Sequence, residues 1–447
     1  MTGQVTIRGA QLVDGRSCDI RISEGVITEL GSLGHAAGRE IDATGLLALP
    51  GLVDLHTHLR EPGFEQSETV LTGTQAAASG GFTAVFAMAN TSPVADTAGV
   101  VEQVHTLGES AGYATVRPIG AVTVGLAGER LAELGAMATS RAQVRVFSDD
   151  GKCVFDPQLM RRALEYVKAW DGVVAQHAQE PRLTEGAQMN EGALSAELGL
   201  TGWPAVAEES IIARDVLLAE HVGSRVHICH LSTAGSVDVV RWAKKRGISV
   251  TAEVTPHHLL LDEELVRGYD ARFKVNPPLR RAEDVLALRE ALADGTIDIV
   301  ATDHAPHPSE DKECEWGAAA FGMVGLESAL SVVHEAVVST GQLGWADVAR
   351  VLSSAPAEIG RLPGYATGIT VGAPAHLALY DPQARQVFGR ESLHGRSVNS
   401  PYLGRELPGR VITTIHHGIV TVEGGELVDA ETVSRAAAAR RGSAAHG

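Results

Sequence analysis

The chain has 447 residues, of which 44% are hydrophobic and 21% are charged, so it can bury a large core and is not a mostly disordered chain. Lys and Arg number 37 and Asp and Glu number 55, which gives a formal net charge of −18. This balance argues against a broad surface for nucleic acid or anionic membrane, but it allows an anionic substrate held by one or two local arginines.

Cysteine usage and hydropathy indicate the compartment. Cys18, Cys153, Cys229 and Cys314 lie far apart and form no Cys-x-x-Cys pair, so we expect neither a disulfide scaffold nor a cysteine-rich zinc site. No leader-like segment opens the chain, and no apolar run approaches the ~18 residues of a membrane helix. The sequence therefore predicts a cytoplasmic protein that binds neither nucleic acid nor membrane.

Residues 1–50 are predicted to be the N-terminal part of a small β domain. Runs at 4–9, 19–23 and 25–30 contain β-branched residues and are separated by turn pairs such as Asp14-Gly15. Pro50-Gly51 marks the end of this part.

Residues 51–362 alternate short apolar runs with amphipathic or Ala-rich segments, which is typical of parallel βα units. The expected strands are 52–56, 82–88, 115–121, 143–149, 173–177, 225–230, 249–255 and 297–303. Eight such units predict an α/β fold, a (β/α)8 TIM-type barrel. An open doubly wound sheet is the alternative, but it usually has fewer strands, and no Gly-x-Gly-x-x-Gly turn follows the first strand.

The β pattern returns in residues 363–430, with expected strands at 376–380, 411–415 and 419–422 and a turn at Asp381-Pro382. We expect both chain ends to form one small β-sandwich domain beside the barrel. Residues 431–447 are an Ala-rich tail, expected to be a frayed helix or a disordered segment.

Two histidines close the first expected barrel strand. His56 and His58 are two residues apart, so they point the same way from a strand. Two neutral imidazoles can hold a divalent metal, although a pair of exposed or core histidines would give the same pattern.

Other strand ends carry the same kind of residue. The fourth ends at Asp149-Asp150, the fifth at His177, the sixth at His230 and the eighth at Asp303. Because these ends converge on one face of a barrel, we predict a site there for one or two zinc-like ions. Each residue alone could be a cap or a surface residue, but a shared rim favours the metal.

A two-metal site needs a bridging anion. We favour Asp150, with Asp149 orienting its neighbours or capping the turn. A carbamylated Lys152 is the alternative, but it follows Gly151 in a turn and is not on the strand. A bound metal would activate water and polarise a carbonyl, and Asp303 is placed to move the proton, so the pattern predicts metal-assisted hydrolysis of an amide or similar bond.

Several further residues are candidates for substrate contact. Arg60 could hold a carboxylate, or it could form a surface salt bridge. Asn90 and Asn276 could contact substrate or serve only in turns. The remaining candidates are His307, which follows Asp303 by four residues, and the backbone at Phe321-Gly322; His257 and His258 are interpreted as structural.

These motifs carry a family resemblance. Residues 54–63 (DLHTHLREPG) and 301–312 (ATDHAPHPSEDK) resemble the two signatures of dihydroorotases in the amidohydrolase superfamily. Residues 147–151 (FSDDG), with His177 and His230, are similar to the class I branch, and the similarity covers almost the whole chain.

The resemblance implies a zinc enzyme of pyrimidine biosynthesis, with one or two ions per subunit, that interconverts N-carbamoyl-L-aspartate and (S)-dihydroorotate. In the family's mechanism a metal-bridging hydroxide attacks the ring amide carbonyl. If the family's residue roles are carried over to this sequence, Asp303 would be both a metal ligand and the general acid/base. The other metal ligands would be His56, His58, Asp150, His177 and His230. The substrate contacts would be His58, Arg60, Asn90, Asn276, His307, Phe321 and Gly322.

The resemblance also implies a homo-oligomer such as a dimer, and a complex with aspartate carbamoyltransferase as a further partner. Two alternatives stay open: an allantoinase or hydantoinase-like enzyme, and an inactive partner of the transcarbamoylase. The apparent lack of a carbamylated lysine weakens the hydantoinase interpretation, and the complete ligand set favours activity.

Overall fold

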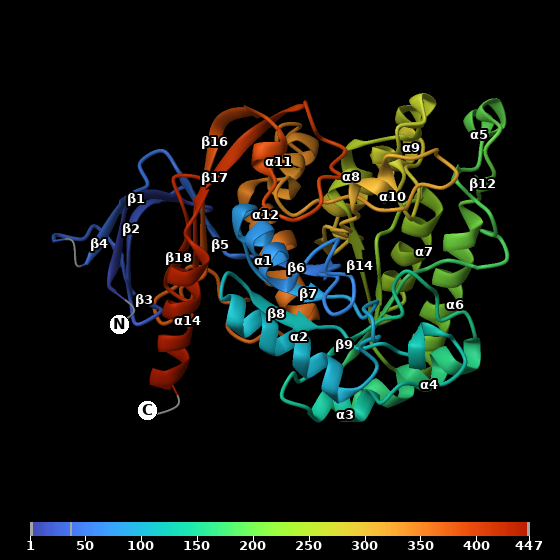
Figure 1. The fold of residues 1–447 in the computed structure, drawn as a ribbon, viewed down its shortest axis with the longest axis horizontal. Helices are drawn as coiled ribbons and strands as arrows, with labels where there is room; N and C mark the ends of the chain where they lie inside the picture. Colours follow the sequence, from blue (N-terminus) through green and yellow to red (C-terminus); the bar gives the residue numbers. More distant parts are fainter. Residues whose placement is uncertain (1–2, 36–37, 445–447) are drawn as a thin grey trace.

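The computed structural model describes residues 3–35 and 38–444. Its larger part, at the right of Figure 1, is a ring of parallel strands. The strands are β6 (Leu52–Thr57), β7 (Phe82–Ala87), β8 (Thr115–Pro118), β9 (Val146–Phe147), β10 (Val173–Gln176), β13 (Val226–Ile228), β14 (Val250–Val254) and β15 (Ile299–Val300). Hydrogen bonds join β6, β7 and β8 in one sheet and β9, β10, β13, β14 and β15 in another. Parallel bridges from Gly120 to Phe147 and from Thr57 to His304 close the ring, which confirms the predicted TIM-type barrel.

Helices surround the ring, as Figure 1 shows. They are α1 (Val70–Ser79), α2 (Ala98–Ala111), α3 (Leu134–Thr139), α4 (Pro157–Val167), α6 (Val206–Val222), α7 (Ala234–Lys245), α9 (Ala282–Ala293) and α11 (Ala329–Val333), which continues as the π-helical turn η5 (His334–Val338). The side chains of Thr69, Asp156 and Thr233 accept hydrogen bonds from backbone N–H groups three residues later. Such caps fix where α1, α4 and α7 begin, and so set the length of the loops that precede them.

The strands present two apolar faces. One set of side chains fills the inside of the ring, and the other packs under the helices, as the period of two along a strand requires. The inner set includes Val53, Leu55, Phe86, Ile119, Val173, Ala175 and Cys229.

A helical segment covers the end of the ring where the strands begin. It comprises α12 (Trp345–Ala349), η6 (Arg350–Ser354) and α13 (Ala355–Ile359). Ile359, Leu362 and Tyr365 pack against the inner apolar set, and the Ser353 hydroxyl donates to the Gly51 carbonyl at the start of β6. The opposite end, where the strands finish, is therefore the one left for a site.

Both chain ends form the small domain. Its strands are β1 (Val5–Leu12), β2 (Ser17–Ser23), β3 (Val26–Gly31), β4 (Arg39–Asp42), β5 (Leu47–Pro50), β16 (Leu377–Val387), β17 (Glu406–His416), β18 (Ile419–Glu423) and β19 (Glu426–Leu427). They pair in the order β19-β18-β17-β16-β5-β1-β2-β3, with β4 on β1. The antiparallel pair β5–β16 joins the two ends of the chain, so the expected β-sandwich from both ends is confirmed.

Two C-terminal segments differ from the sequence prediction. The turn expected at Asp381-Pro382 does not end the strand: β16 runs on to Val387, and the expected turn is a bulge within it, where the register with β17 shifts and Asp381 Oδ1 accepts the N–H groups of Gln383 and Ala384. The Ala-rich segment contains α14 (Ala430–Ala444), which buries Val433 and Ala437; the Ser434 hydroxyl donates to the Ser110 carbonyl of α2. Residues 445–447 lie outside the described part.

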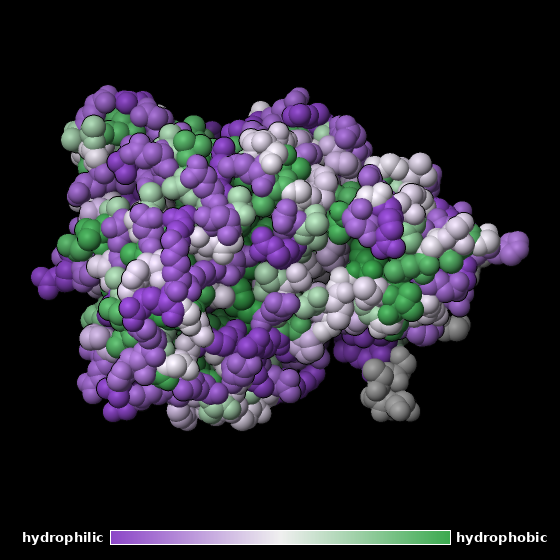
Figure 2. All heavy atoms as spheres, turned by 180° about the vertical axis from the view of Figure 1, so that it is seen from behind, coloured by the Kyte–Doolittle hydropathy of each residue, from purple (hydrophilic) through white to green (hydrophobic). Residues whose placement is uncertain are grey.

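Short elements lie in the loops between the barrel units. They are β11 (Met189–Asn190), β12 (Gly202–Trp203), α5 (Ala193–Leu198), α8 (Pro256–Leu260) and α10 (Ser309–Lys312). The surface seen from behind is mostly hydrophilic, with apolar residues in groups separated by polar ones (Figure 2). Within the described ranges, no helix combines the length and the apolar composition that a membrane span needs.

Candidate metal centre

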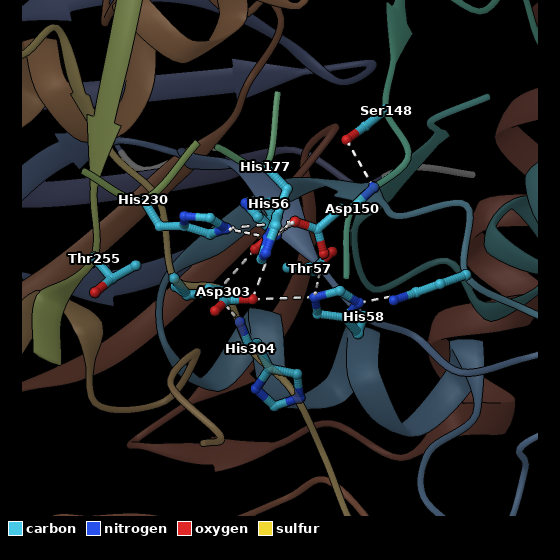
Figure 3. A network of polar contacts seen from close by, with 12 residues as sticks. His56, Thr57, His58, Ser148, Asp150, His177, His230, Thr255, Asp303 and His304 are labelled. Carbon is cyan, nitrogen blue, oxygen red and sulfur yellow. Dashed lines mark hydrogen bonds and ion pairs between the residues drawn. The ribbon is translucent and has the colours of Figure 1, made fainter. Parts of the chain in front are cut away.

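Six buried side chains from five strand ends point toward one another at the rim of the barrel, as Figure 3 shows. They form two groups that share one carboxylate, and within each group the possible ligand atoms lie within 4.8 Å of one another. The first group is His56, His58, Asp150 and Asp303, and the second is Asp150, His177 and His230.

The first group is built on the end of β6. His58 Nε2 lies 3.0 Å from Asp303 Oδ1 and 3.3 Å from Asp150 Oδ2. His56 Nε2 lies 3.3 Å from Asp303 Oδ1 and 3.4 Å from Asp150 Oδ1. Both imidazoles therefore face the same two carboxylates.

The second group follows β10 and β13. His177 Nδ1 lies 2.9 Å from His230 Nε2 and 3.2 Å from Asp150 Oδ1. His230 Nε2 is 3.4 Å from the same Asp150 oxygen. Because Asp150 reaches both groups, its carboxylate has the geometry of a bridge.

The residues fit a divalent cation. His56 Nε2 is buried and has no hydrogen-bond partner, and it faces carboxylate oxygens that, like a neutral imidazole nitrogen, can only accept. Positive charge at this point resolves the conflict, supplied either by a proton on Nε2 or by a cation between these acceptors. Imidazole nitrogen with carboxylate oxygen is a ligand set that zinc prefers.

The pKa shifts describe the same electrostatic environment. Burial alone would lower the pKa of His56, but Asp150, Glu253 and Asp303 raise it well above its usual value. Burial would raise the pKa of Asp303, yet the neighbouring histidines lower it to about 2, and those around Asp150 hold its pKa well below the usual range. The carboxylates are thus anionic at neutral pH, and the centre favours positive charge.

Each of three histidines is oriented by a second hydrogen bond. The Nδ1–H of His58 donates to Asn90 Oδ1 (2.9 Å), and the Nε2–H of His177 donates to Gln179 Oε1 (2.7 Å). The Nδ1–H of His56 donates to Glu253 Oε1 (2.6 Å). When these rings are neutral, as metal binding requires, these bonds leave the other ring nitrogen of each histidine with its lone pair toward the centre.

The three candidates for the bridge are in different positions. Asp149 accepts the backbone N–H groups of Val122 (2.8 Å) and Thr123 (2.9 Å), so it fixes the turn. Lys152 is exposed, whereas Asp150 is 4% exposed and lies inside the histidine cluster. The expected division between Asp149 and Asp150 agrees with these contacts.

The backbone is strained where the rim residues are presented. His230 (φ 32°), Asp303 (φ 47°) and Arg60 (φ 62°) adopt left-handed conformations that non-glycine residues avoid. Such strain tends to collect at functional sites.

Arg60 and His307 lie beside the first group. The Arg60 Nε–H donates to the Pro306 carbonyl, and its Nη2 lies 3.4 Å from His307 Nε2. Burial lowers the pKa of Arg60 to about 10, so the guanidinium stays charged at neutral pH. Among the described residues, no carboxylate forms an ion pair with it. His307 donates to the Phe321 carbonyl (2.8 Å), and burial lowers its pKa to about 3, so it is neutral.

Some of the groups expected to contact the substrate's ring already form hydrogen bonds within the protein. Asn276 donates to Gln179 Oε1 (3.2 Å), and its buried Oδ1 has no partner. The Gly322 N–H donates to the Lys274 carbonyl, and the Gly322 carbonyl accepts from Lys312 (3.0 Å). A Cβ at Gly322, where φ is 140°, would meet His307 Nε2 at 2.8 Å, so glycine lets the chain pass close to this imidazole.

Sequence reasoning did not single out Glu253 or Gln179. Both touch candidate ligands, but Glu253 lies inside an apolar strand and Gln179 follows His177 in a loop. His257 and His258 lie nearby; His258 contacts Thr255 Oγ1 (2.8 Å), which agrees with a structural role.

Comparison with known proteins agrees with this geometry. Residues 45–236 match a family model described as Dihydro-orotase-like. Three proteins named Dihydroorotase are similar over most of their length: that of Leifsonia xyli subsp. xyli is 76% identical over 95% of this chain and 97% of its own. The Streptomyces coelicolor protein is 68% identical, over 94% of this chain and 99% of its own. The Mycobacterium tuberculosis protein is 53% identical, over 95% of this chain and 99% of its own.

Solved structures share the fold. An L-hydantoinase (dihydropyrimidinase) from Arthrobacter aurescens superposes with a TM-score of 0.85 at 24% identity, covering 96% of this chain and 98% of that one. A dihydropyrimidinase from Brevibacillus agri gives 0.83 at 23% identity, covering 95% and 96%. At this identity the likeness establishes the barrel with its attached β domain and nothing about the substrate.

Proposed function

Because this chain belongs to the dihydroorotase family, we propose that its rim centre holds zinc and catalyses the reversible cyclisation of N-carbamoyl-L-aspartate to (S)-dihydroorotate and water. This is a step of pyrimidine biosynthesis on a small-molecule substrate. The observation that carries the proposal is the convergence of four histidines and two carboxylates beside Arg60, a cation without a carboxylate partner among the described residues.

Two ions would share Asp150. His56, His58 and Asp303 would hold one, and His177 and His230 the other; a single ion would use the first set. A zinc ion held by these residues would lower the pKa of water to about 7 and polarise the substrate carbonyl.

Asp303 would move the proton. Its low pKa makes it a carboxylate at neutral pH, able to accept a proton from the attacking water. Its Oδ1 faces His58, so its other oxygen is free to pass that proton to the departing ring nitrogen. Cyclisation uses the same residue in reverse.

Arg60 would select the substrate by its carboxylate. The guanidinium can donate two parallel hydrogen bonds to a carboxylate, and its partly buried position strengthens the attraction. Asn90, His307 and His58 would line this end of the substrate, and Asn276 and the Phe321-Gly322 backbone the ring end. Since the Gly322 N–H already has a partner, Asn276 with its free Oδ1 is the stronger candidate for the ring.

The test combines metal analysis with paired assays. Purified protein should contain one or two zinc ions per chain, cyclise carbamoyl-aspartate and hydrolyse dihydroorotate. Parallel assays with allantoin and dihydrouracil should give much lower rates. Zinc uptake without any turnover of dihydroorotate would contradict the proposal and favour a silent partner of aspartate carbamoyltransferase.

The domain roles and the assembly are also proposed. The barrel of residues 51–362 supplies all the ligands, so it would be the catalytic domain, and the β strands of 1–50 and 363–430 would support it, with 431–447 as an appended segment. A homo-oligomer such as a dimer, and a complex with the transcarbamoylase, are predictions that sedimentation of the protein alone and with that enzyme would test.

A further inference from the structure

Glu253 lies on β14, inside the barrel and just below the candidate metal ligands. It is 1% exposed. Its Oε1 accepts the Nδ1–H of His56 (2.6 Å) and the backbone N–H of His230 (3.2 Å). One carboxylate oxygen therefore contacts a residue of each ligand group.

The other oxygen is engaged as well. Glu253 Oε2 lies 3.0 Å from Nε2 of His227, a fully buried residue on β13, and the second nitrogen of that imidazole contacts Thr251 Oγ1 at 2.8 Å. A buried carboxylate is costly unless its oxygens are satisfied, and here three N–H groups satisfy them. Thr251, His227, Glu253 and His56 thus form one chain of polar contacts that ends at the centre.

The contact to His56 determines what that imidazole can do. An N–H at Nδ1 leaves a lone pair at Nε2, the atom that faces Asp150 and Asp303. A carboxylate behind a ligating histidine also makes the ring a stronger donor to a metal.

We propose that Glu253 is a positioning residue of the metal centre: it fixes the tautomer and orientation of His56 and, through the His230 N–H, the spacing between the two ligand groups. This inference rests on the proposed function, since it assumes that the rim binds zinc.

The experiment compares Glu253→Gln with Glu208→Gln. Glu208 is a matched control, because it is 2% exposed and accepts the Ser232 N–H (2.9 Å) without touching the six side chains. Zinc affinity is measured by competition with a chromogenic chelator, together with the melting temperature of the zinc-free protein. We expect Glu253→Gln to weaken zinc binding about 10- to 100-fold, the usual effect of losing such a partner, and Glu208→Gln to leave it unchanged.

Two further measurements separate positioning from general destabilisation. Saturating zinc should restore most of the kcat of Glu253→Gln, because the ligands themselves remain. His227→Asn keeps the carboxylate and removes one of its partners, so it should weaken zinc binding in the same direction but by less.

The outcomes are distinct. Wild-type protein that takes up no zinc would overturn the proposed function and this inference together. Zinc binding by Glu253→Gln as tight as in wild type, or equal weakening in the Glu208→Gln control, would overturn this inference alone.

Discussion

Histidines cluster in two regions of this molecule, and the two clusters differ in what surrounds them. At the rim, the imidazoles of His56, His58, His177 and His230 face carboxylates. Where the small domain meets the barrel, His376, His416 and His417 also have ligand atoms within 4.8 Å of one another. There, His416 donates to the Gly112 carbonyl (2.9 Å) and contacts Thr115 Oγ1 (3.0 Å).

The charges are opposite in the two places. Carboxylates raise the pKa of His56. In the second cluster, burial and then His416 and Arg440 lower the pKa of His376. Burial and Arg440 lower the pKa of His416 to about 4. Close imidazoles alone therefore do not define a metal site. Convergent carboxylates make the rim a cation site. The second cluster brings imidazoles together with no carboxylate in the group, so nothing there offsets a cation's charge, although His376 Nε2 also has no hydrogen-bond partner.

The largest expected effect comes from deleting a pair of histidines in each cluster. The double change His56→Ala with His58→Ala should remove the ion held by the first set and lower turnover roughly 10³-fold or more, because water there then keeps its ordinary pKa. The matched pair His376→Ala with His416→Ala should keep zinc and kcat within about twofold, and lose only stability from hydrogen bonds worth about 1 kcal/mol each. Loss of zinc-dependent turnover in a folded His376/His416 variant would erase the distinction between the clusters.

Replacing Asp303 tests the proposed proton transfer at the rim. Asp303→Asn should keep the fold and lower kcat by roughly 10²- to 10⁴-fold, the usual share of acid/base catalysis. Asp149→Asn is the control, since that carboxylate accepts backbone N–H groups in a turn and should mainly lower the melting temperature. Steady-state rates near wild type for Asp303→Asn would exclude the role.

Arg60 tests charge complementarity at the rim. Arg60→Ala should lower kcat/KM for dihydroorotate about 10- to 100-fold, because hydrogen bonds to charged groups contribute about 1.5–3 kcal/mol. Dihydrouracil, which has no carboxylate, should lose much less, and Arg60→Lys should recover only part of the rate. Equal losses for both substrates would mean that Arg60 serves the structure of the loop.

The second cluster predicts a small pH effect on stability. The folded-state pKa of His416, about 4, is below the ordinary value of about 6.5, so the unfolded chain binds this proton first as the pH falls. Stability is therefore lost between pH 6.5 and 4, by about 2 kcal/mol at pH 5 for this group. His416→Gln should unfold in urea with less difference between pH 7.5 and pH 5; an unchanged difference would mean that His416 does not titrate in this way.

The sequence predicts the barrel and its six rim side chains because the information is local. Each apolar run ends in a polar residue, and the barrel topology then carries the ends of β6, β10 and β13 to one rim. The preference for Asp150 over Asp149 is supported by the backbone N–H groups of Val122 and Thr123, which only the fold brings near Asp149.

Long-range contacts explain what the sequence does not reveal. Glu253 occupies a strand position like any polar strand residue, and its partners His56 and His227 belong to other strands. The second cluster joins His376 and His416 to Thr115, far earlier in the chain. Asp381-Pro382 has the composition of a turn, but it forms a bulge inside β16, because pairing with β17 resumes at Arg385.

The pairing of β5 with β16 has a consequence for synthesis. β5 ends at Pro50 and its partner begins at Leu377, so the ribosome must add the entire barrel before this edge can be covered. At about 5–20 residues per second, that wait is roughly 15–65 seconds, during which the edge of β5 is open to other chains. The nascent polypeptide is thus most exposed to mispairing late in translation, and slowing elongation within the barrel codons should increase aggregation of this protein more than slowing it after residue 387.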